Sequence, residues 1–222
     1  MGLIKSIKRR WKLANAPRHE REYIAEYRRW LKDDGEAKRY HFPGLPKDAV
    51  IIDLGGYEGE WATGIAGKYN PTIHVFEPHP GFSTNLEKLF EGNARITVHP
   101  VALASKNDTF FLSDEGNASR SIQQDNGVTA RSVESKAYLA ELGISHVDLM
   151  KVNIEGGEYD ILPHLVETNF IQNIDILQVQ FHRFSDDDEA RRSAIVSALA
   201  QTHSRTWCYP FIWEEWRLTT SR

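Results

Sequence analysis

Two short segments combine acidic residues and glycines in a way that could bind a small ligand. The first, Asp53-Leu-Gly55-Gly56-Tyr-Glu-Gly59, follows a short apolar run. Glycine permits tight turns and lets the backbone approach a ligand closely. The spacing differs from the G-x-G-x-x-G pattern that accepts a pyrophosphate, and its leading carboxylate would repel that anion. We therefore expect Asp53, Gly55, Gly56 and Gly59 to bind a positively charged ligand, such as a sulfonium with its amino acid ammonium.

The second segment, Val75-Phe76-Glu77-Pro78, places Glu77 21 residues after Gly56. An acidic residue about 20 positions after a glycine loop commonly holds the hydroxyls of a ribose. Both carboxylate oxygens of such a residue can accept hydrogen bonds. A solvated loop carboxylate is the alternative. Because the two segments have the expected spacing, we favour ribose binding for Glu77.

A third segment, residues 148–158, carries charge inside a run that is otherwise apolar. It reads Asp-Leu-Met-Lys151-Val-Asn153-Ile-Glu155-Gly-Gly-Glu158. In a strand, Lys151 and Asn153 share one face, and a buried ammonium is costly unless it is paired. We expect Glu155 and Glu158 to be its partners, near the strand end where open α/β sheets bind ligands. A structural Lys–Glu pair and a catalytic role are equally supported.

A histidine follows the next predicted strand, in Gln180-Phe181-His182. Because its unperturbed pKa lies near physiological pH, His182 could take a proton from a substrate hydroxyl. A hydrogen-bonded structural histidine is the alternative. The acidic run at residues 186–189 is better explained by helix capping and the helix dipole than by a metal, so we expect no metal site.

The order of apolar runs and helical segments predicts an α/β fold. Strands are expected at residues 49–53, 72–77, 95–98, 147–154 and 174–181, and helices at 58–69, 82–90, 158–168 and 187–201. Strands without polar alternation, interleaved with helices, indicate a mostly parallel sheet covered on both faces. Trp207, Tyr209, Phe211 and Trp213 alternate with period two, which predicts one late antiparallel strand at the sheet edge.

Residues 1–47 are expected to form a basic extension and linker outside a main domain of residues 48–222. Helices are predicted over residues 3–13 and 19–34, and the second should place Tyr23, Tyr27 and Trp30 on one face against the main domain. Residues 1–32 carry ten lysines and arginines against three glutamates, whereas the whole chain has a net charge of −4. Such a segment could contact anionic lipid or the acidic remainder of the chain. We do not expect nucleic acid as a partner.

The composition, with 41% hydrophobic and 26% charged residues, is typical of a soluble globular protein. No apolar run approaches the roughly 18 residues of a membrane-spanning helix, and the start lacks the features of a secretory signal. Cys208 is the single cysteine, so no internal disulfide can form. We expect a cytoplasmic location, with peripheral contact at the inner membrane face through the basic helices as an option.

Together these segments resemble the FkbM family of methyltransferases, which use S-adenosylmethionine to methylate hydroxyls, often on sugars or natural products. The similarity runs from about Val50 to His182. It is carried by residues 52–59, 75–78, 85–86, 101–104, the loop at Ser119 and, most specifically, residues 148–158. The resemblance implies a Rossmann-like class I methyltransferase fold, S-adenosylmethionine as cofactor, and adenine binding near Val101 and Ala102.

Three positions depart from the family pattern. Asn153 stands where the family has aspartate, Gly157 where it has alanine, and Gln180 where many members have glutamate. The resemblance implies methyl transfer to a hydroxyl of a saccharide, glycan or related metabolite, with Glu155 or His182 as base and Lys151 and Asn153 orienting it. The two missing carboxylates leave open a non-catalytic cofactor-binding or scaffold protein of a glycan-assembly complex. A nucleotide-dependent oxidoreductase is disfavoured by the missing G-x-G-x-x-G pattern.

Overall fold

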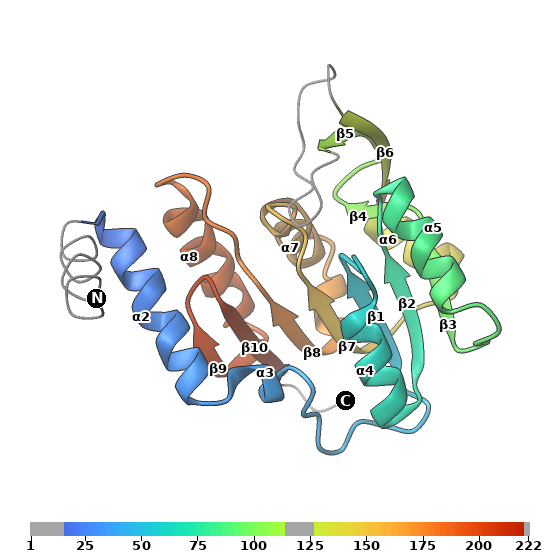
Figure 1. Cartoon of the computed structure of the whole chain (residues 1–222), viewed down its shortest axis with the longest axis horizontal. Coiled ribbons are helices and arrows are strands. Elements are labelled where there is room, and N and C mark those ends of the chain that lie inside the picture. The colour runs from blue at the N-terminus through green and yellow to red at the C-terminus, as the bar shows by residue number, and fades with distance from the viewer. Residues whose placement is uncertain (1–15, 114–126, 220–222) are drawn as a thin grey trace, which may run out of the picture.

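The structure is a computed structural model that describes residues 16–113 and 127–219. The helix expected over residues 3–13 and the loop at Ser119 lie outside the described residues. A seven-stranded sheet of order β3-β2-β1-β7-β8-β10-β9 forms the centre of the molecule (Figure 1). Its parallel core consists of β1 (Val50–Leu54), β2 (Thr72–Phe76), β3 (Ile96–His99), β7 (Val147–Val152) and β8 (Ile174–Val179).

Helices cover both faces of this sheet, as the apolar strands predict. They are α4 (Glu60–Tyr69), α5 (Pro80–Leu89), α6 (Ser135–Glu141), α7 (Glu158–Glu167) and α8 (Asp188–Leu199). Ile52 of β1 belongs to the core cluster that includes side chains of α6, α7 and α8, whereas its neighbour Ile51 belongs to the cluster of α4 and α5. Successive strand residues thus enter opposite cores, which explains why the strands show no polar alternation. The expected α/β fold is confirmed.

The end of the chain differs from the single late strand that the sequence predicts. It forms a hairpin of β9 (His203–Tyr209) and β10 (Trp213–Leu218), with β10 antiparallel to both β8 and β9. The turn contains Phe211, which has a positive φ of 60°. The period-two pattern continues through the turn by coincidence, because Trp207 and Trp213 belong to different strands. The antiparallel edge itself is confirmed.

A second, smaller sheet lies between β3 and β7 in the sequence, where no elements were predicted. Its order is β4-β6-β5, from β4 (Ala102–Ala104), β5 (Asp108–Ser113) and β6 (Gly127–Glu134). This sheet contacts the main domain at Ser105, directly after β4. The carboxylate of Asp160 in α7 accepts hydrogen bonds from both the backbone N–H and the hydroxyl of Ser105. A short 3₁₀ helix, η2 (Phe170–Asn173), precedes β8.

The described part of the basic extension packs on the main domain. It contains α2 (Arg18–Lys32) and the short α3 (Gly35–Lys38), and α2 lies along the β9 edge (Figure 1). Trp30 is buried against Trp207 and Tyr209. Tyr23 and Tyr27 instead stack on each other and stay about half exposed, so only Trp30 of the predicted face is buried.

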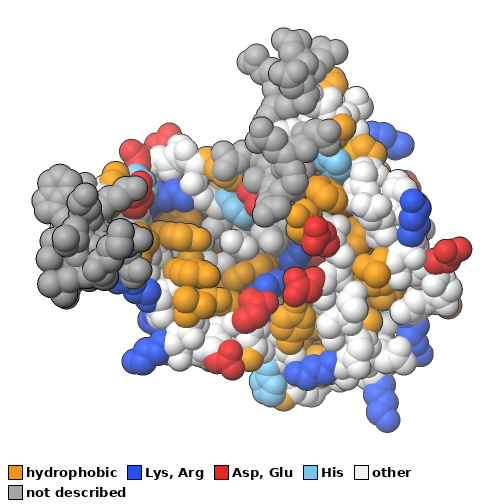
Figure 2. Space-filling view, in the orientation of Figure 1, with side chains coloured by type: hydrophobic (Ala, Val, Ile, Leu, Met, Phe, Trp, Pro, Cys, Tyr) orange, Lys and Arg blue, Asp and Glu red, His pale blue; other side chains and the backbone are white. Residues whose placement is uncertain are grey.

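The surface beside α2 is partly apolar, and Figure 2 shows hydrophobic side chains gathered there. Among the described residues, no helix combines the length and apolar character needed to cross a bilayer.

Candidate active site

A cavity of about 720 Å³ opens at the carboxyl ends of β1, β2 and β7, where residues of the smaller sheet form its opposite wall. Its volume falls within the range of small-molecule sites, about 300–1,000 Å³. Open α/β sheets bind ligands at this edge of the strands. The cavity is therefore the candidate active site.

The predicted site residues divide into two groups around this cavity. The five that line it are Gly55, Glu77, Ala102, Asn153 and Glu155. The six that lie behind its wall are Asp53, Gly56, Gly59, Val101, Lys151 and His182. The first group can contact a ligand directly, whereas the second does not line the cavity.

Lys151 is paired with Asp53. These residues are register partners on β1 and β7, and the Lys151 Nζ lies 2.8 Å from Asp53 Oδ1. The ammonium also donates to the carbonyls of Leu54, at 3.3 Å, and Gly55, at 2.7 Å. The expectation that Glu155 and Glu158 pair with Lys151 is therefore wrong. Both glutamates follow the strand end, whereas strand pairing brings Asp53 directly beside Lys151.

Both charges of this pair are almost completely buried, with side-chain exposures of 3% for Lys151 and 1% for Asp53. Burial raises the pKa of Asp53, while the ammonium of Lys151 opposes that rise. The pair thus braces the tips of β1 and β7 under the glycine turn. Contact of Asp53 with a cationic ligand stays a prediction, and its geometry favours a supporting role beneath the turn.

At each glycine of the first motif, a side chain would collide with a different part of the protein. Gly55 has a φ of +82°, and a Cβ there would lie 2.0 Å from the backbone oxygen of Asn153. A Cβ at Gly56 would collide with Val75, and one at Gly59 would collide with Leu86. Gly55 thus lets the β1 and β7 loops approach beside the cavity, while the other two allow α5 to pack closely.

Glu77 is buried at the cavity wall and connects two loops. Its Oε2 accepts from the N–H of Tyr57, and its Oε1 accepts from the N–H of His79, both at 2.9 Å. Burial raises the pKa of Glu77, and the two N–H donors act in the opposite direction. A carboxylate has about four lone-pair sites, so oxygen lone pairs remain for ligand hydroxyls. The alternative of a solvated loop carboxylate does not describe this side chain.

The two residues predicted to bind adenine, Val101 and Ala102, lie in different surroundings. Ala102 begins β4 and lines the cavity, whereas Val101 belongs to the hydrophobic core under α6 and α7. The two side chains point in different directions because successive residues of an extended chain alternate. Ala102 and its neighbours Leu103 and Ala104 offer the cavity a small, apolar surface.

Asn153 provides a test of whether these residues fit a cofactor. Its Oδ1 is buried in the cavity wall and has no hydrogen-bond partner among residues 16–113 and 127–219. A buried acceptor without a partner costs roughly 1–3 kcal/mol, so a donor on a ligand would stabilise it. The ammonium of S-adenosylmethionine is such a donor. Together with Glu77 and the volume of the cavity, Asn153 fits this cofactor.

His182 lies behind the cavity wall, between two carboxylates. Its Nδ1 is 3.1 Å from Glu158 Oε1, and its Nε2 is 3.3 Å from Glu155 Oε1. Burial alone would lower the pKa of His182, but the two glutamates raise it to about 9. Of the two bases proposed from the sequence, Glu155 faces the cavity, and His182 carries a proton at neutral pH.

The sequence did not single out several residues that line the cavity. The aromatic ones are Tyr57, Phe76, Phe82, Phe110 and Phe184, of which Tyr57 and Phe82 contact each other edge to face. Phe184 is 46% exposed and stacks parallel to the ring of His182. Phe110 belongs to the smaller sheet, whose β-prone runs at residues 108–113 and 127–134 were the available signal.

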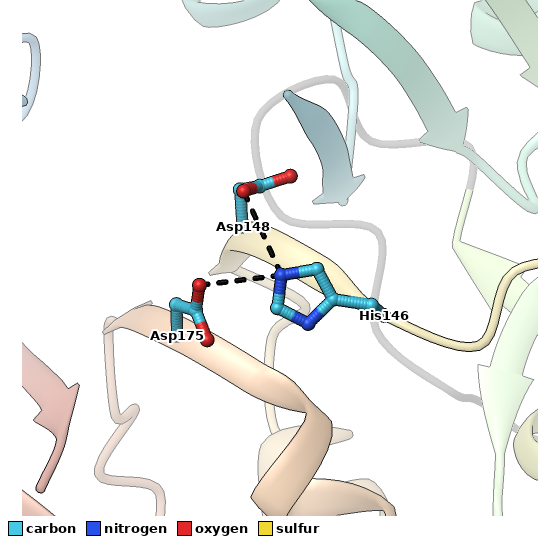
Figure 3. Close-up of side chains that lie close together, drawn as sticks. All are labelled: His146, Asp148 and Asp175. Carbon is cyan, nitrogen blue, oxygen red and sulfur yellow. Dashed lines mark ion pairs between the residues drawn. The ribbon is translucent and has the colours of Figure 1, made fainter. Parts of the chain in front are cut away.

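One group of side chains elsewhere could offer ligand atoms to a metal. His146, Asp148 and Asp175 face one another at the amino ends of β7 and β8 (Figure 3), with the His146 Nε2 3.6 Å from Asp148 and 3.2 Å from Asp175. This edge of the sheet is opposite the cavity. Asp148 also accepts the N–H of Val50, which gives it a role in strand pairing. The contacts are those of a histidine between two carboxylates, so we assign no metal to them.

The sheet order and the cavity at the strand ends are those of class I methyltransferases. A similar fold occurs in Methyltransferase FkbM from Methylobacillus flagellatus KT, with a TM-score of 0.52, 16% identity, and coverage of 80% of this chain and 46% of that one. A fibrillarin/Nop5p complex matches with a TM-score of 0.53 and 12% identity over 82% of this chain and 78% of that one. At these identities the likeness concerns the fold alone.

The sequence specifies the family. Residues 53–205 match the family model of the methyltransferase FkbM domain, so the chain belongs to the FkbM family of methyltransferases. Methyltransferase 1 of Beauveria bassiana (strain ARSEF 2860) is 25% identical over 153 residues, which cover 56% of this chain. The match spans only 61% of the length of that relative. The recognition made from residues 50–182 is thereby confirmed.

Proposed function

We propose that this protein is an S-adenosylmethionine-dependent O-methyltransferase that acts on a hydroxyl of a saccharide, glycan or related metabolite. S-adenosylmethionine, when bound, supplies a methyl group that its sulfonium makes electrophilic. Glu77, Gly55 and Ala102 would hold its adenosyl part, and Asn153 would accept from its ammonium. The protein then mainly aligns the substrate hydroxyl and removes its proton.

One observation carries the proposal, namely the buried Glu77 carboxylate at the cavity wall. Each of its oxygens is oriented by a backbone N–H, from Tyr57 on one side and His79 on the other. A carboxylate that is already held in this way loses little further conformational entropy when it accepts hydrogen bonds from two adjacent hydroxyls. Membership of the FkbM family supports the same cofactor.

The variant Glu77→Gln tests this assignment. It replaces an ionised acceptor with a neutral amide of nearly the same size, so at least one charge-assisted hydrogen bond to the ribose is lost. Such bonds contribute about 1.5–3 kcal/mol, which corresponds to a roughly 10- to 150-fold weaker affinity for S-adenosylhomocysteine. Isothermal titration calorimetry measures this directly.

Glu87→Gln is the matched control, because Glu87 is exposed on α5, the helix that follows Glu77. It should bind S-adenosylhomocysteine as the wild type does. Circular dichroism and thermal unfolding establish that both variants fold. A folded Glu77→Gln protein with unchanged affinity would contradict the ribose assignment.

The acceptor is supported by the part of the cavity beyond Glu77. Glu155 and Asp160 contribute carboxylates there, and the exposed ring of Phe184 contributes an apolar surface. Polar and apolar groups side by side suit a saccharide, which presents hydroxyls and C–H groups together. Transfer of a labelled methyl group to a mixed polysaccharide extract tests this, and base-stable incorporation that depends on Glu155 is expected. Labelling only of protein or nucleic acid would contradict the acceptor class.

A second candidate function is cofactor binding without catalysis, in a scaffold of a glycan-assembly complex. It is favoured by Asn153, which brings a neutral amide to the cavity where the family pattern implied a carboxylate. Tight binding of S-adenosylmethionine with no transfer to any extract fraction would favour the scaffold. Turnover with release of S-adenosylhomocysteine would favour the enzyme.

We further propose a cytoplasmic protein that contacts anionic membranes through its basic extension. The described helix α2 carries five arginines and lysines against three glutamates, together with an exposed apolar Leu31. Basic residues next to exposed apolar ones favour binding at the surface of anionic lipid. Cosedimentation with phosphatidylserine vesicles, compared with neutral vesicles, tests this, and equal recovery with both would contradict it.

A further inference from the structure

Three ionisable side chains meet where the loop after β7 and the segment after β8 border the cavity. Glu155 lines the cavity, with 27% of its side chain exposed. Its φ of 49° lies in the left-handed region, which is uncommon for a residue other than glycine. Such a conformation persists only where surrounding contacts enforce it, and it occurs most often at functional sites.

Both carboxylate oxygens of Glu158 accept hydrogen bonds from the protein backbone. Its Oε2 accepts from the N–H of Gly156 at 2.8 Å, and its Oε1 accepts from the N–H of His182 at 2.7 Å. Its side chain is completely buried. Glu158 therefore has no route to a substrate and serves as a fixed anion at the start of α7.

The ring of His182 bridges this fixed anion to Glu155. Each ring nitrogen faces a carboxylate oxygen, Nδ1 toward Glu158 at 3.1 Å and Nε2 toward Glu155 at 3.3 Å. A neutral imidazole has one donor and one acceptor nitrogen, so one of its lone pairs would face a carboxylate. Only the imidazolium, with a proton on both nitrogens, satisfies both contacts.

The other groups around this ring do not change its charge balance. Tyr159 donates its hydroxyl to the backbone oxygen of His182, and burial raises the pKa of Tyr159, so it stays neutral. Arg191 of α8 lies over the ring of Tyr159 and pairs with Asp188. In the part of the chain that the structure describes, the ion-pair partners of His182 are the two glutamates alone.

We propose that Glu155 accepts the proton of the substrate hydroxyl and that His182, held as an imidazolium between Glu155 and Glu158, is a positioning residue that orients the Glu155 carboxylate. This inference rests on the proposed function. As the hydroxyl oxygen forms its bond to the methyl carbon, the carbon–sulfur bond breaks with its electron pair on sulfur, and the hydroxyl proton passes to Glu155. His182 keeps both of its protons throughout.

The charge of His182 can be measured without any activity. Heteronuclear NMR of the histidine rings, with His182 assigned by comparison with His182→Gln, should give a titration midpoint near pH 9. Glu155→Gln should lower that midpoint, because it removes one of the two anions. A midpoint at or below pH 6.5, the ordinary value for histidine, would overturn the proposal.

The pH dependence of kcat/KM separates the two roles. If His182 must stay charged, the rate falls as the pH passes about 9, and His182→Gln lacks this falling limb. If His182 were the base, the rate would instead rise through pH 9. Glu155→Gln should lower kcat about 10²- to 10⁴-fold, as expected for loss of a general base.

Two further variants distinguish positioning from a purely structural effect. His182→Gln should lower kcat about 10- to 100-fold with little change in the KM for S-adenosylmethionine, and His182→Lys should recover part of that loss because it keeps a cation beside Glu155. His164→Gln is the control, since His164 of α7 also pairs with a glutamate, Glu134, but neither residue lines the cavity.

No rescue by His182→Lys, together with a rate that rises through pH 9, would refute the positioning role. If the proposed function itself were wrong, the binding and NMR measurements would give a different combination of results. S-adenosylhomocysteine would then not bind, whereas the NMR titration of His182 would still report its charge.

Discussion

The buried Lys151–Asp53 pair allows a quantitative prediction about stability. Replacing Lys151 with Met keeps the length of the side chain but removes its charge and its three donors. The Asp53 carboxylate then stays in the core without its counterion, and the carbonyls of Leu54 and Gly55 lose their shared donor. Breaking a buried ion pair on one side costs about 3–5 kcal/mol. For a chain of 222 residues this lowers the melting temperature by roughly 6–20 °C.

A matched control exists in the same protein. Lys106 and Asp108 are also 2.8 Å apart, but their side chains are 73% and 50% exposed. Lys106→Met should therefore cost no more than about 1 kcal/mol, because water screens the exposed pair. Urea unfolding followed by circular dichroism gives both free energies of unfolding.

The double variant Asp53→Leu/Lys151→Met isolates the cause. It removes both charges, and replacing a buried pair with apolar residues is often neutral or stabilising. The double variant should thus be more stable than Lys151→Met alone. In Lys151→Met the deficit should also shrink as the pH falls toward 4, because burial raises the pKa of Asp53 and protonation removes its charge. If Lys151→Met costs no more than Lys106→Met, the argument from burial is refuted.

Four other predictions follow from local geometry and from shifted pKa values. Gly55→Ala should lower stability by about 1–3 kcal/mol and weaken S-adenosylhomocysteine binding in calorimetry, because its Cβ would lie 2.0 Å from the Asn153 oxygen at a positive φ. Gly67→Ala, in α4 with open space around the new Cβ, should instead stabilise the protein by about 0.5–1 kcal/mol, and the opposite order of the two variants in thermal unfolding would contradict both assignments. Because the folded-state pKa of His182 is raised to about 9 from 6.5, its contribution of about 3 kcal/mol is complete below pH 6.5 and is lost as the pH rises through 9. Urea titrations at pH 6 and 10 should show this loss in the wild type and not in His182→Gln. Burial lowers the pKa of His99 to about 4, so stability should fall as the pH drops from 6.5 toward 4, and a His99→Phe variant that kept the same slope would argue against this origin.

The sequence was sufficient for the parts of the fold that depend on local patterns. The five parallel strands and the helices after β1, β2, β7 and β8 all occur within about two residues of their expected bounds. Continuous apolar runs and helix-forming segments determine these elements, because burial on both faces of a sheet selects such runs. Glu77 was also predicted correctly to follow a strand at the edge of the sheet where the cavity opens, since its spacing from Gly56 follows from one β-α-β unit.

The sequence did not predict elements whose identity depends on distant partners. The smaller sheet pairs β4 with β6 across about thirty residues, and β4 itself has only three residues, too few for a local pattern. The alternation from Trp207 to Trp213 suggested one strand because the turn residue Phe211 follows the same period. The segment becomes two strands because β10 turns back to pair with β9 on one side and with β8 on the other.

The residue types at the site were therefore determined by the sequence, whereas their partners were decided by tertiary structure. The glycine motif, Glu77 and the segment from Lys151 to Glu158 specified the family and the side of the sheet where the cavity opens. The register of β1 against β7 pairs Lys151 with Asp53. The loop after β7 and the segment after β8 meet so that His182 lies between Glu155 and Glu158. Charge interactions act through space over a few ångströms, so the partner of a charged group depends on which strands and loops become neighbours, and no local pattern along the chain records that choice.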